Sequence, residues 1–114
     1  MAQPARSYML SCTVDPAKRE LLADLRAAHL THILNHQAEI VFGGVSGAAD
    51  GPPETICIVV RANSAAEVDA MARADPYAQT YAEIRISEFQ QRLPEKFPGQ
   101  LAQVRDALVS EANE

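Results

Sequence analysis

The stretch TICIVV at residues 55–60 constrains the fold more than any other feature of the chain. Its residues are β-branched or apolar at consecutive positions, a pattern typical of a strand that is buried on both faces of a sheet. Three further strands are predicted at residues 7–14, 39–46 and 81–90, the last from its alternation of polar and apolar residues. The chain therefore carries a sheet whose third strand needs cover on two sides.

Two helices are predicted between these strands. The first spans residues 17–36 and follows an Asp15-Pro16 pair, with Asp as the cap and Pro at the first helical position. The second follows a capping box from Ser64 to Glu67 and ends at a turn over residues 75–79. The resulting order, β-α-β-β-α-β, favours an α+β, ferredoxin-like fold in which an antiparallel sheet carries two helices on one face.

Two helices cover only one face of such a sheet, yet the strand at 55–60 needs burial on both. We therefore expect a homodimer in which two copies pack sheet to sheet. Residues 1–93 are predicted to form this domain. Residues 94–114 are predicted to form a linker and a short amphipathic helix, with Leu101, Val104 and Leu108 on one side, that docks on its own or its partner's domain.

Composition narrows the choice of partners. A formal net charge of −5 argues against binding to nucleic acid or to an anionic membrane surface, because phosphate binding needs a basic face. No apolar run approaches the ~20 residues of a membrane span, and the first residues lack the pattern of a signal peptide, so a cytoplasmic location is expected. Cys12 and Cys57 are too few for a disulfide framework and are predicted to be buried free thiols.

All three histidines, His29, His32 and His36, lie in the stretch RAAHLTHILNH at residues 26–36. On a helix they share one face, but two turns separate the outer pair by ~10 Å of rise, so their rings do not easily converge on one ion. Neither a metal site nor a cofactor is predicted. His32 and His36 are interpreted as structural, since a histidine near a helix C-terminus is favoured by the helix dipole.

Several short motifs lie in register with the predicted elements: Arg26 and His29-Leu30 in RAAHL, Gly43, and ADPYA at 74–78. Together, over residues 8–92, they resemble the YciI-like (YCII-related) family of small α+β proteins. The resemblance implies a ferredoxin-like domain that pairs into a dimeric α/β barrel, in agreement with the topology argument. It also implies an active site built on a His–Asp pair, carried here by His29 and Asp75.

The chemistry of such a pair is coherent. A histidine titrates near neutral pH, and a carboxylate bonded to one ring nitrogen fixes the tautomer and raises the basicity of the other nitrogen. Arg26, one turn before His29, would bind an anionic group of a substrate, and Tyr77 would donate a hydrogen bond. Weaker candidates for lining the pocket are Ser11, Thr13 and Thr55.

The spacing of the pair raises a geometric problem. An unbroken helix from Pro16 would place His29 ~20 Å along its axis, at 1.5 Å per residue. Asp75, at the end of the second helix, would then lie near the start of the first and out of reach. We therefore predict a break or offset around Leu25–Ala27, which places His29 close to the start of a new helix.

Two functions remain open. The first is a small-molecule enzyme in which the His–Asp pair moves a proton in an elimination, an isomerisation or a hydrolysis; dehalogenation of ring compounds is among the activities proposed for the family. The second is a non-catalytic dimeric module that binds a small ligand or a protein partner.

Overall fold

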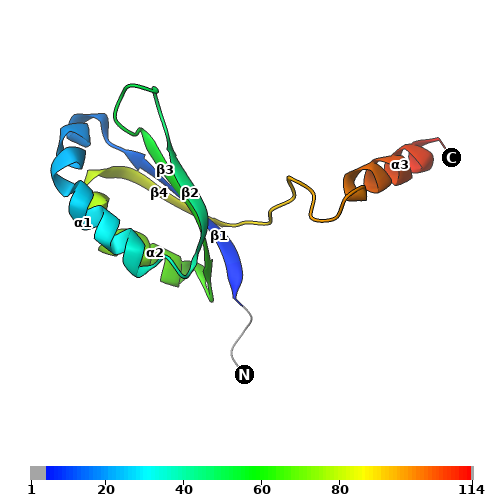
Figure 1. Cartoon of the computed structure of the whole chain (residues 1–114), viewed down its shortest axis with the longest axis horizontal. Coiled ribbons are helices and arrows are strands. Elements are labelled where there is room, and N and C mark those ends of the chain that lie inside the picture. The colour runs from blue at the N-terminus through cyan, green and yellow to red at the C-terminus, as the bar shows by residue number, and fades with distance from the viewer. Residues whose placement is uncertain (1–4, 114) are drawn as a thin grey trace.

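The structure, a computed structural model, describes residues 5–113 and is built on a four-stranded sheet (Figure 1). Its elements are β1 (Arg6–Val14), η1 (Pro16–Leu21), α1 (Leu22–Asn35), β2 (Ile40–Ser46), β3 (Thr55–Ala62), α2 (Ala65–Ala74), η2 (Pro76–Thr80), β4 (Tyr81–Glu88) and α3 (Gln100–Ala112), where η marks a 3-10 helix. The prediction of an α+β, ferredoxin-like fold is confirmed.

The sheet order is β2-β3-β1-β4, and every neighbouring pair of strands is antiparallel. The apolar run at 55–60 belongs to β3, which has a strand on either side. Ile56, Ile58 and Val60 alternate onto the face that carries the helices and join the core. Val59 points to the other face and is still only 1% exposed, which agrees with a strand buried on both sides.

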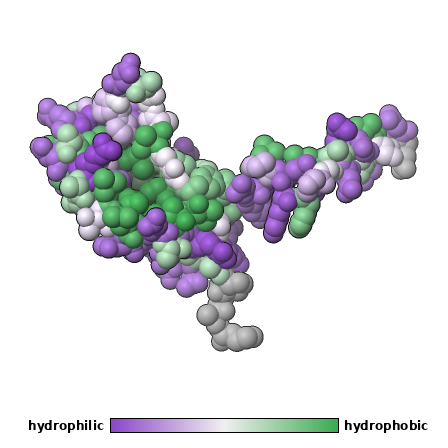
Figure 2. All heavy atoms as spheres, in the orientation of Figure 1, coloured by the Kyte–Doolittle hydropathy of each residue, from purple (hydrophilic) through white to green (hydrophobic). Residues whose placement is uncertain are grey.

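The core lies between the sheet and the two helices α1 and α2. β1 contributes Leu10, Cys12 and Val14, while α2 contributes Val68 and Ala72. The two helices do not cover the whole helix-side face of four strands. Figure 2 shows that an apolar surface stays open beside α1, over the part of the sheet that includes β2.

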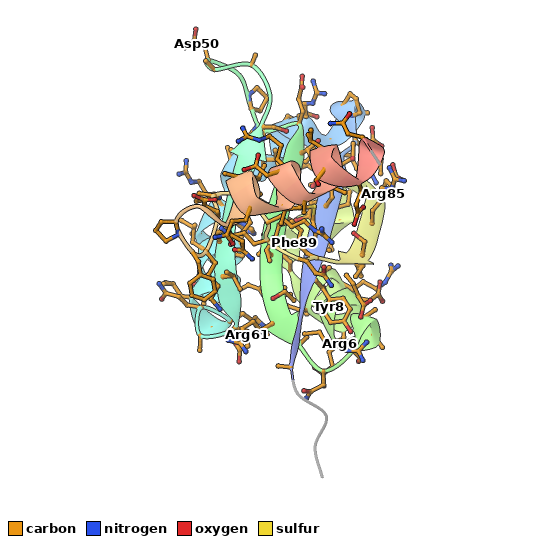
Figure 3. The ribbon with its side chains drawn as sticks, turned by 90° about the vertical axis from the view of Figure 1, so that its right-hand side faces the viewer. Arg6, Tyr8, Asp50, Arg61, Arg85 and Phe89 are labelled. Atoms are coloured by element: carbon orange, nitrogen blue, oxygen red, sulfur yellow. The ribbon has the colours of Figure 1, made fainter. Side chains whose placement is uncertain are left out.

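The opposite face of the sheet carries neither α1 nor α2, and we call it the open face (Figure 3). Arg61 from β3 and Arg85 from β4 extend from this face. Phe89, just after β4, packs edge-to-face on Phe42 of β2 with ring centroids 5.8 Å apart. The open face therefore mixes aromatic, apolar and charged groups.

The C-terminal helix α3 lies apart from the domain, on the side of the sheet opposite to α1 and α2 (Figures 1 and 3). Its apolar residues Leu101, Val104 and Leu108 are exposed. Of the two surfaces predicted for this helix, its own domain is wrong, because the linker carries α3 away from the core; docking on a partner's domain stays a prediction. No helix within residues 5–113 is both long enough and apolar enough to cross a bilayer.

The predicted break around Leu25–Ala27 is also wrong, because α1 is continuous from Leu22 to Asn35. The change lies earlier, where η1 gives way to α1. The side chain of Asp15 caps η1 by accepting a bond from the Ala17 N–H at 2.9 Å. His29 is thus the eighth residue of α1, about 10 Å from its start at 1.5 Å per residue.

Candidate active site

His29 and Asp75 meet between α1 and the junction of α2 with η2. The Nδ1–H of His29 donates to both carboxylate oxygens of Asp75, at 2.9 and 2.8 Å. The His29 side chain is 12% exposed and that of Asp75 is 5% exposed. Because η2 packs against the middle of α1, the pair forms two turns into the helix without a break in it. The two residues that the family resemblance singled out are therefore direct neighbours.

Asp75 has two structural tasks at once. It ends α2 with extended backbone angles, φ −68° and ψ 131°, and Pro76 then starts η2. Its Oδ1 accepts a second bond, from the Tyr77 N–H at 2.9 Å, and so caps η2. The carboxylate of Asp75 thus both caps η2 and binds His29, and the cap fixes its orientation toward the imidazole.

The ring of Tyr77 lies flat on the imidazole of His29, with centroids 3.8 Å apart and planes inclined by 4°. Burial raises the pKa of the Tyr77 hydroxyl; the nearby Arg26 charge opposes this and the Asp75 charge adds to it. The hydroxyl is therefore protonated at neutral pH. Tyr77 packs against one face of the imidazole, a contact that the sequence did not predict.

A pocket of about 650 Å³ opens beside this pair. Its walls come from η1, α1, β2, the β2–β3 loop and η2. Its polar residues are Arg19, Glu20, Arg26, His29 and Tyr77. Arg26 is therefore placed at the pocket, as the sequence analysis expected.

Arg19 was missed by the sequence analysis. Its Nε atom is buried and has no hydrogen-bond partner within the part of the chain that the structure describes. A terminal nitrogen of the same guanidinium lies 3.8 Å from Glu54. No clear pattern in the sequence singles out Arg19, because it lies in the 3-10 helix η1 whereas Arg26 lies in α1.

A second, smaller hollow of about 310 Å³ adjoins the pocket, and we call it the α1–β2 groove. It shares His29, Leu30 and Val45 with the pocket. Ile56 and Ile58 of β3 also line it. The groove is apolar, in contrast to the arginine-lined pocket.

The structure does not bring the three weaker candidates to this site. Ser11 and Thr13 alternate with Cys12 and Val14, which point into the core, so their own side chains lie on the open face. Thr55 pairs with Thr13 and lies on the same face. Strand alternation therefore separates all three from His29.

His32 lies one turn further along α1 and His36 caps its end, and their ring centroids are 4.6 Å apart. No group of three or more His, Cys, Asp or Glu side chains within residues 5–113 is arranged to hold a metal ion.

Cys12 is a buried free thiol as predicted, whereas Cys57 is only partly buried. Burial raises the pKa of the Cys12 thiol to about 12.

Comparison with known proteins adds a family and a fold. A family model described as YCII-related domain matches residues 7–90. No curated protein matches the chain. Among solved structures, 5-chloro-2-hydroxyhydroquinone dehydrochlorinase from Burkholderia phenoliruptrix AC1100, in complex with 2,5-dihydroxybenzoquinone, matches with a TM-score of 0.70 and 22% identity. The match covers 79% of this chain and 99% of that chain.

Two other structures are more distant. A nipsnap family protein with unknown function from Agrobacterium tumefaciens strain C58 has a TM-score of 0.44 and 16% identity, over 82% of this chain and 96% of that one. A conserved protein from Methanosarcina mazei Go1 has a TM-score of 0.43 and 15% identity, over 80% and 96%.

Proposed function

Because the chain belongs to the family of YCII-related domains, we propose that it is an acid–base enzyme that acts on a small organic molecule bound beside His29. The observation that carries the proposal is the sheltered pair of His29 and Asp75 at the wall of a 650 Å³ pocket. A sheltered imidazole held by a carboxylate, at the wall of a pocket, is the usual arrangement of a general base.

His29 is the proposed proton acceptor. Its Nδ1–H is held by Asp75, which leaves the lone pair on Nε2, and Nε2 makes no hydrogen bond within residues 5–113. In an elimination, Nε2 would remove a proton from the substrate, the released electron pair would form a new double bond, and the leaving group would depart as an anion. Asp75 would stabilise the imidazolium that forms, without itself taking the proton.

Arg26 and Arg19 are the proposed binding groups for an acidic or electron-rich part of the substrate. Both residues line the pocket with His29, and a guanidinium group matches the geometry of a carboxylate or a similar acidic group. The similar dehydrochlorinase is in complex with 2,5-dihydroxybenzoquinone, a flat ring with acidic hydroxyl groups. That complex supports a flat, acidic ring compound as the first substrate class to test.

We also propose that two copies pair through the open face. Phe42, which is 45% exposed and packs against Phe89, supplies apolar area on that face. Sedimentation of the full chain measures the assembly, and a monomer at micromolar concentration would contradict the pairing.

The test of function is the release of chloride from 5-chloro-2-hydroxyhydroquinone. We expect turnover by the unaltered chain and a loss of about 10³-fold or more in His29→Gln, the range found when a general base or its partner is removed. His32→Gln is the matched control, since it removes an imidazole from the same helix without touching Asp75, and should keep the rate. Equal rates in His29→Gln and the unaltered chain would refute the proposal.

A binding measurement, taken together with turnover, distinguishes the enzyme from the alternative, a non-catalytic binding module. A chain that binds 2,5-dihydroxybenzoquinone, yet releases no chloride and converts no other flat, acidic ring compound, would be the non-catalytic module instead. Calorimetric titration of the unaltered chain and of Arg19→Met with this compound tests the binding role of Arg19, because binding through the arginines weakens in the variant in either case. Turnover then decides between the enzyme and the binding module.

A further inference from the structure

Helix α3 exposes an apolar stripe to solvent. Leu101, Val104 and Leu108 share one face of the helix and are 45%, 52% and 61% exposed. The opposite face carries Gln103 and Ser110. An isolated helix of 13 residues is marginally stable in water, and an amphipathic helix gains most of its stability by packing its apolar side. The helix therefore needs a surface to pack on.

The α1–β2 groove is a surface that needs cover. Two helices over four strands leave the helix-side face of the edge strand β2 bare. Leu30 of α1 is 45% exposed and Val45 of β2 is 64% exposed. The buried Ile56 and Ile58 form its floor. Figure 2 shows this as a continuous apolar surface on the body of the molecule.

The helix cannot easily fill this groove in its own chain. The groove lies on the face of the sheet that carries α1 and α2, whereas α3 lies on the side of the open face (Figures 1 and 3). The linker to α3 follows β4 and runs on the open face, where Phe89 packs on Phe42 of β2. The face is therefore wrong for docking within one chain.

A second copy places the groove where α3 can reach it. Two sheets that pack face to face lie ~10 Å apart, so the partner occupies the side toward which α3 projects. β4 ends at Glu88 and α3 starts at Gln100, which leaves residues 89–99 as the linker. Eleven extended residues span up to ~36 Å, more than the thickness of the partner's sheet and helix layer.

We propose that α3 of one copy packs its apolar stripe into the α1–β2 groove of a second copy, beside the pocket that holds His29. The two-fold symmetry of a homodimer makes the exchange reciprocal, so each copy covers the other's groove. The pocket shares Leu30 and Val45 with the groove, so the partner's helix forms part of the wall of the site. The inference rests on the sheet-to-sheet dimer of the proposed function and not on catalysis.

Disulfide trapping in the full chain tests this inference. All variants carry Cys57→Ser, because Cys57 is partly accessible. A tagged chain with Leu30→Cys is co-expressed with an untagged chain that carries Leu101→Cys, Val104→Cys or Leu108→Cys. After mild oxidation, we expect at least one pair to form a mixed covalent dimer, seen on a non-reducing gel by its intermediate size.

The matched control replaces Ser110, on the polar side of α3, by cysteine and should cross-link at least tenfold less with Leu30→Cys. Equal yields would overturn the assignment of the stripe. Cross-linking of the Leu108→Cys chain with itself would mean that α3 pairs with α3. A double Leu30→Cys, Leu108→Cys chain that closes within itself would mean docking in one copy.

Two further outcomes distinguish this inference from the function on which it rests. A chain that sediments as a dimer and releases chloride, yet gives none of the mixed cross-links, would overturn the helix exchange alone. A chain that sediments as a monomer would overturn the dimer and the exchange together, while chloride release would still decide the role of His29.

Discussion

Replacing Asp75 by asparagine tests the candidate site without any substrate. In the native chain, the carboxylate accepts the His29 Nδ1–H on both oxygens and the Tyr77 N–H on Oδ1. An asparagine keeps one oxygen, which can still cap η2, but its amide is a donor. The imidazole must then accept at Nδ1, so its proton moves to Nε2, the nitrogen proposed to act as the base.

The magnitudes follow from these bonds. Asp75→Asn exchanges a bond to a charged acceptor, ~1.5–3 kcal/mol, for a neutral one, ~0.5–1.5 kcal/mol, so we expect a loss of about 1 kcal/mol in the free energy of unfolding. Asp75→Ala also removes the cap and leaves two buried N–H groups unpaired, for a loss of about 3–4 kcal/mol. At about 4 °C per kcal/mol for a chain of this size, Tm falls by about 4 °C and 14 °C.

The assay for the proton position is nitrogen-15 NMR through the two-bond couplings of the histidine rings. The His29 signals are identified as those that are missing in His29→Gln. We expect a proton on Nδ1 in the unaltered chain and on Nε2 in Asp75→Asn, together with a loss of about 10³- to 10⁴-fold in any turnover. Asp69→Asn is the control, because Asp69 is an exposed carboxylate on α2 that pairs with Arg73.

Two results would refute this reasoning. One is a native His29 that carries its proton on Nε2, which would mean that Asp75 does not hold the ring. The other is an Asp75→Asn chain whose His29 spectrum is unchanged, because the carboxylate would then have no influence on the tautomer.

Three other predictions concern the scaffold. Gly43→Ala should cost about 1–3 kcal/mol in thermal or urea unfolding, because the added Cβ would lie 3.1 Å from a backbone oxygen of β3; Gly44→Ala, with open space, should be near neutral. Burial raises the pKa of Cys12 from 9.0 to about 12, so the folded state keeps a proton that the unfolded chain loses. Stability is then complete below pH 9 and falls as the pH rises toward 12, and Cys12→Ala should flatten this fall in urea titrations. A thiol reagent at neutral pH should reach Cys12 only after denaturation, whereas Cys57, on the open face, should be protected to the extent that two copies pair there.

Local patterns in the sequence were sufficient to predict the strands and α2. The alternation in residues 81–90 and the run at 55–60 each depend on neighbours along the chain, and the Ser64 cap fixes the start of α2 through its bond to the Glu67 N–H. The type of helix after Asp15 was not predictable in this way. The backbone hydrogen bonds of a 3-10 helix span one residue fewer than those of an α-helix, so the two types are closely similar. Here η1 also packs against η2, which lies 60 residues further along the chain.

The candidate site shows the same division. His29 and Asp75 were identified through the family resemblance, since no local pattern connects two residues 46 positions apart. Ser11 could have been excluded from sequence, because Tyr8, Leu10 and Cys12 alternate with it and are the apolar, core-facing side of β1. Thr55 could not, because a run that is apolar at every position does not reveal which face a given residue takes.

The flat contact between the Tyr77 and His29 rings gives the protein an intrinsic optical signal. The chain holds three tyrosines and no tryptophan, so its ultraviolet emission comes from phenol rings alone. One of the three lies 3.8 Å from the imidazole. A compound that displaces His29 from this stack, or protonation of its ring, alters the fluorescence of Tyr77. Unlabelled protein can thus be used to screen chemical libraries.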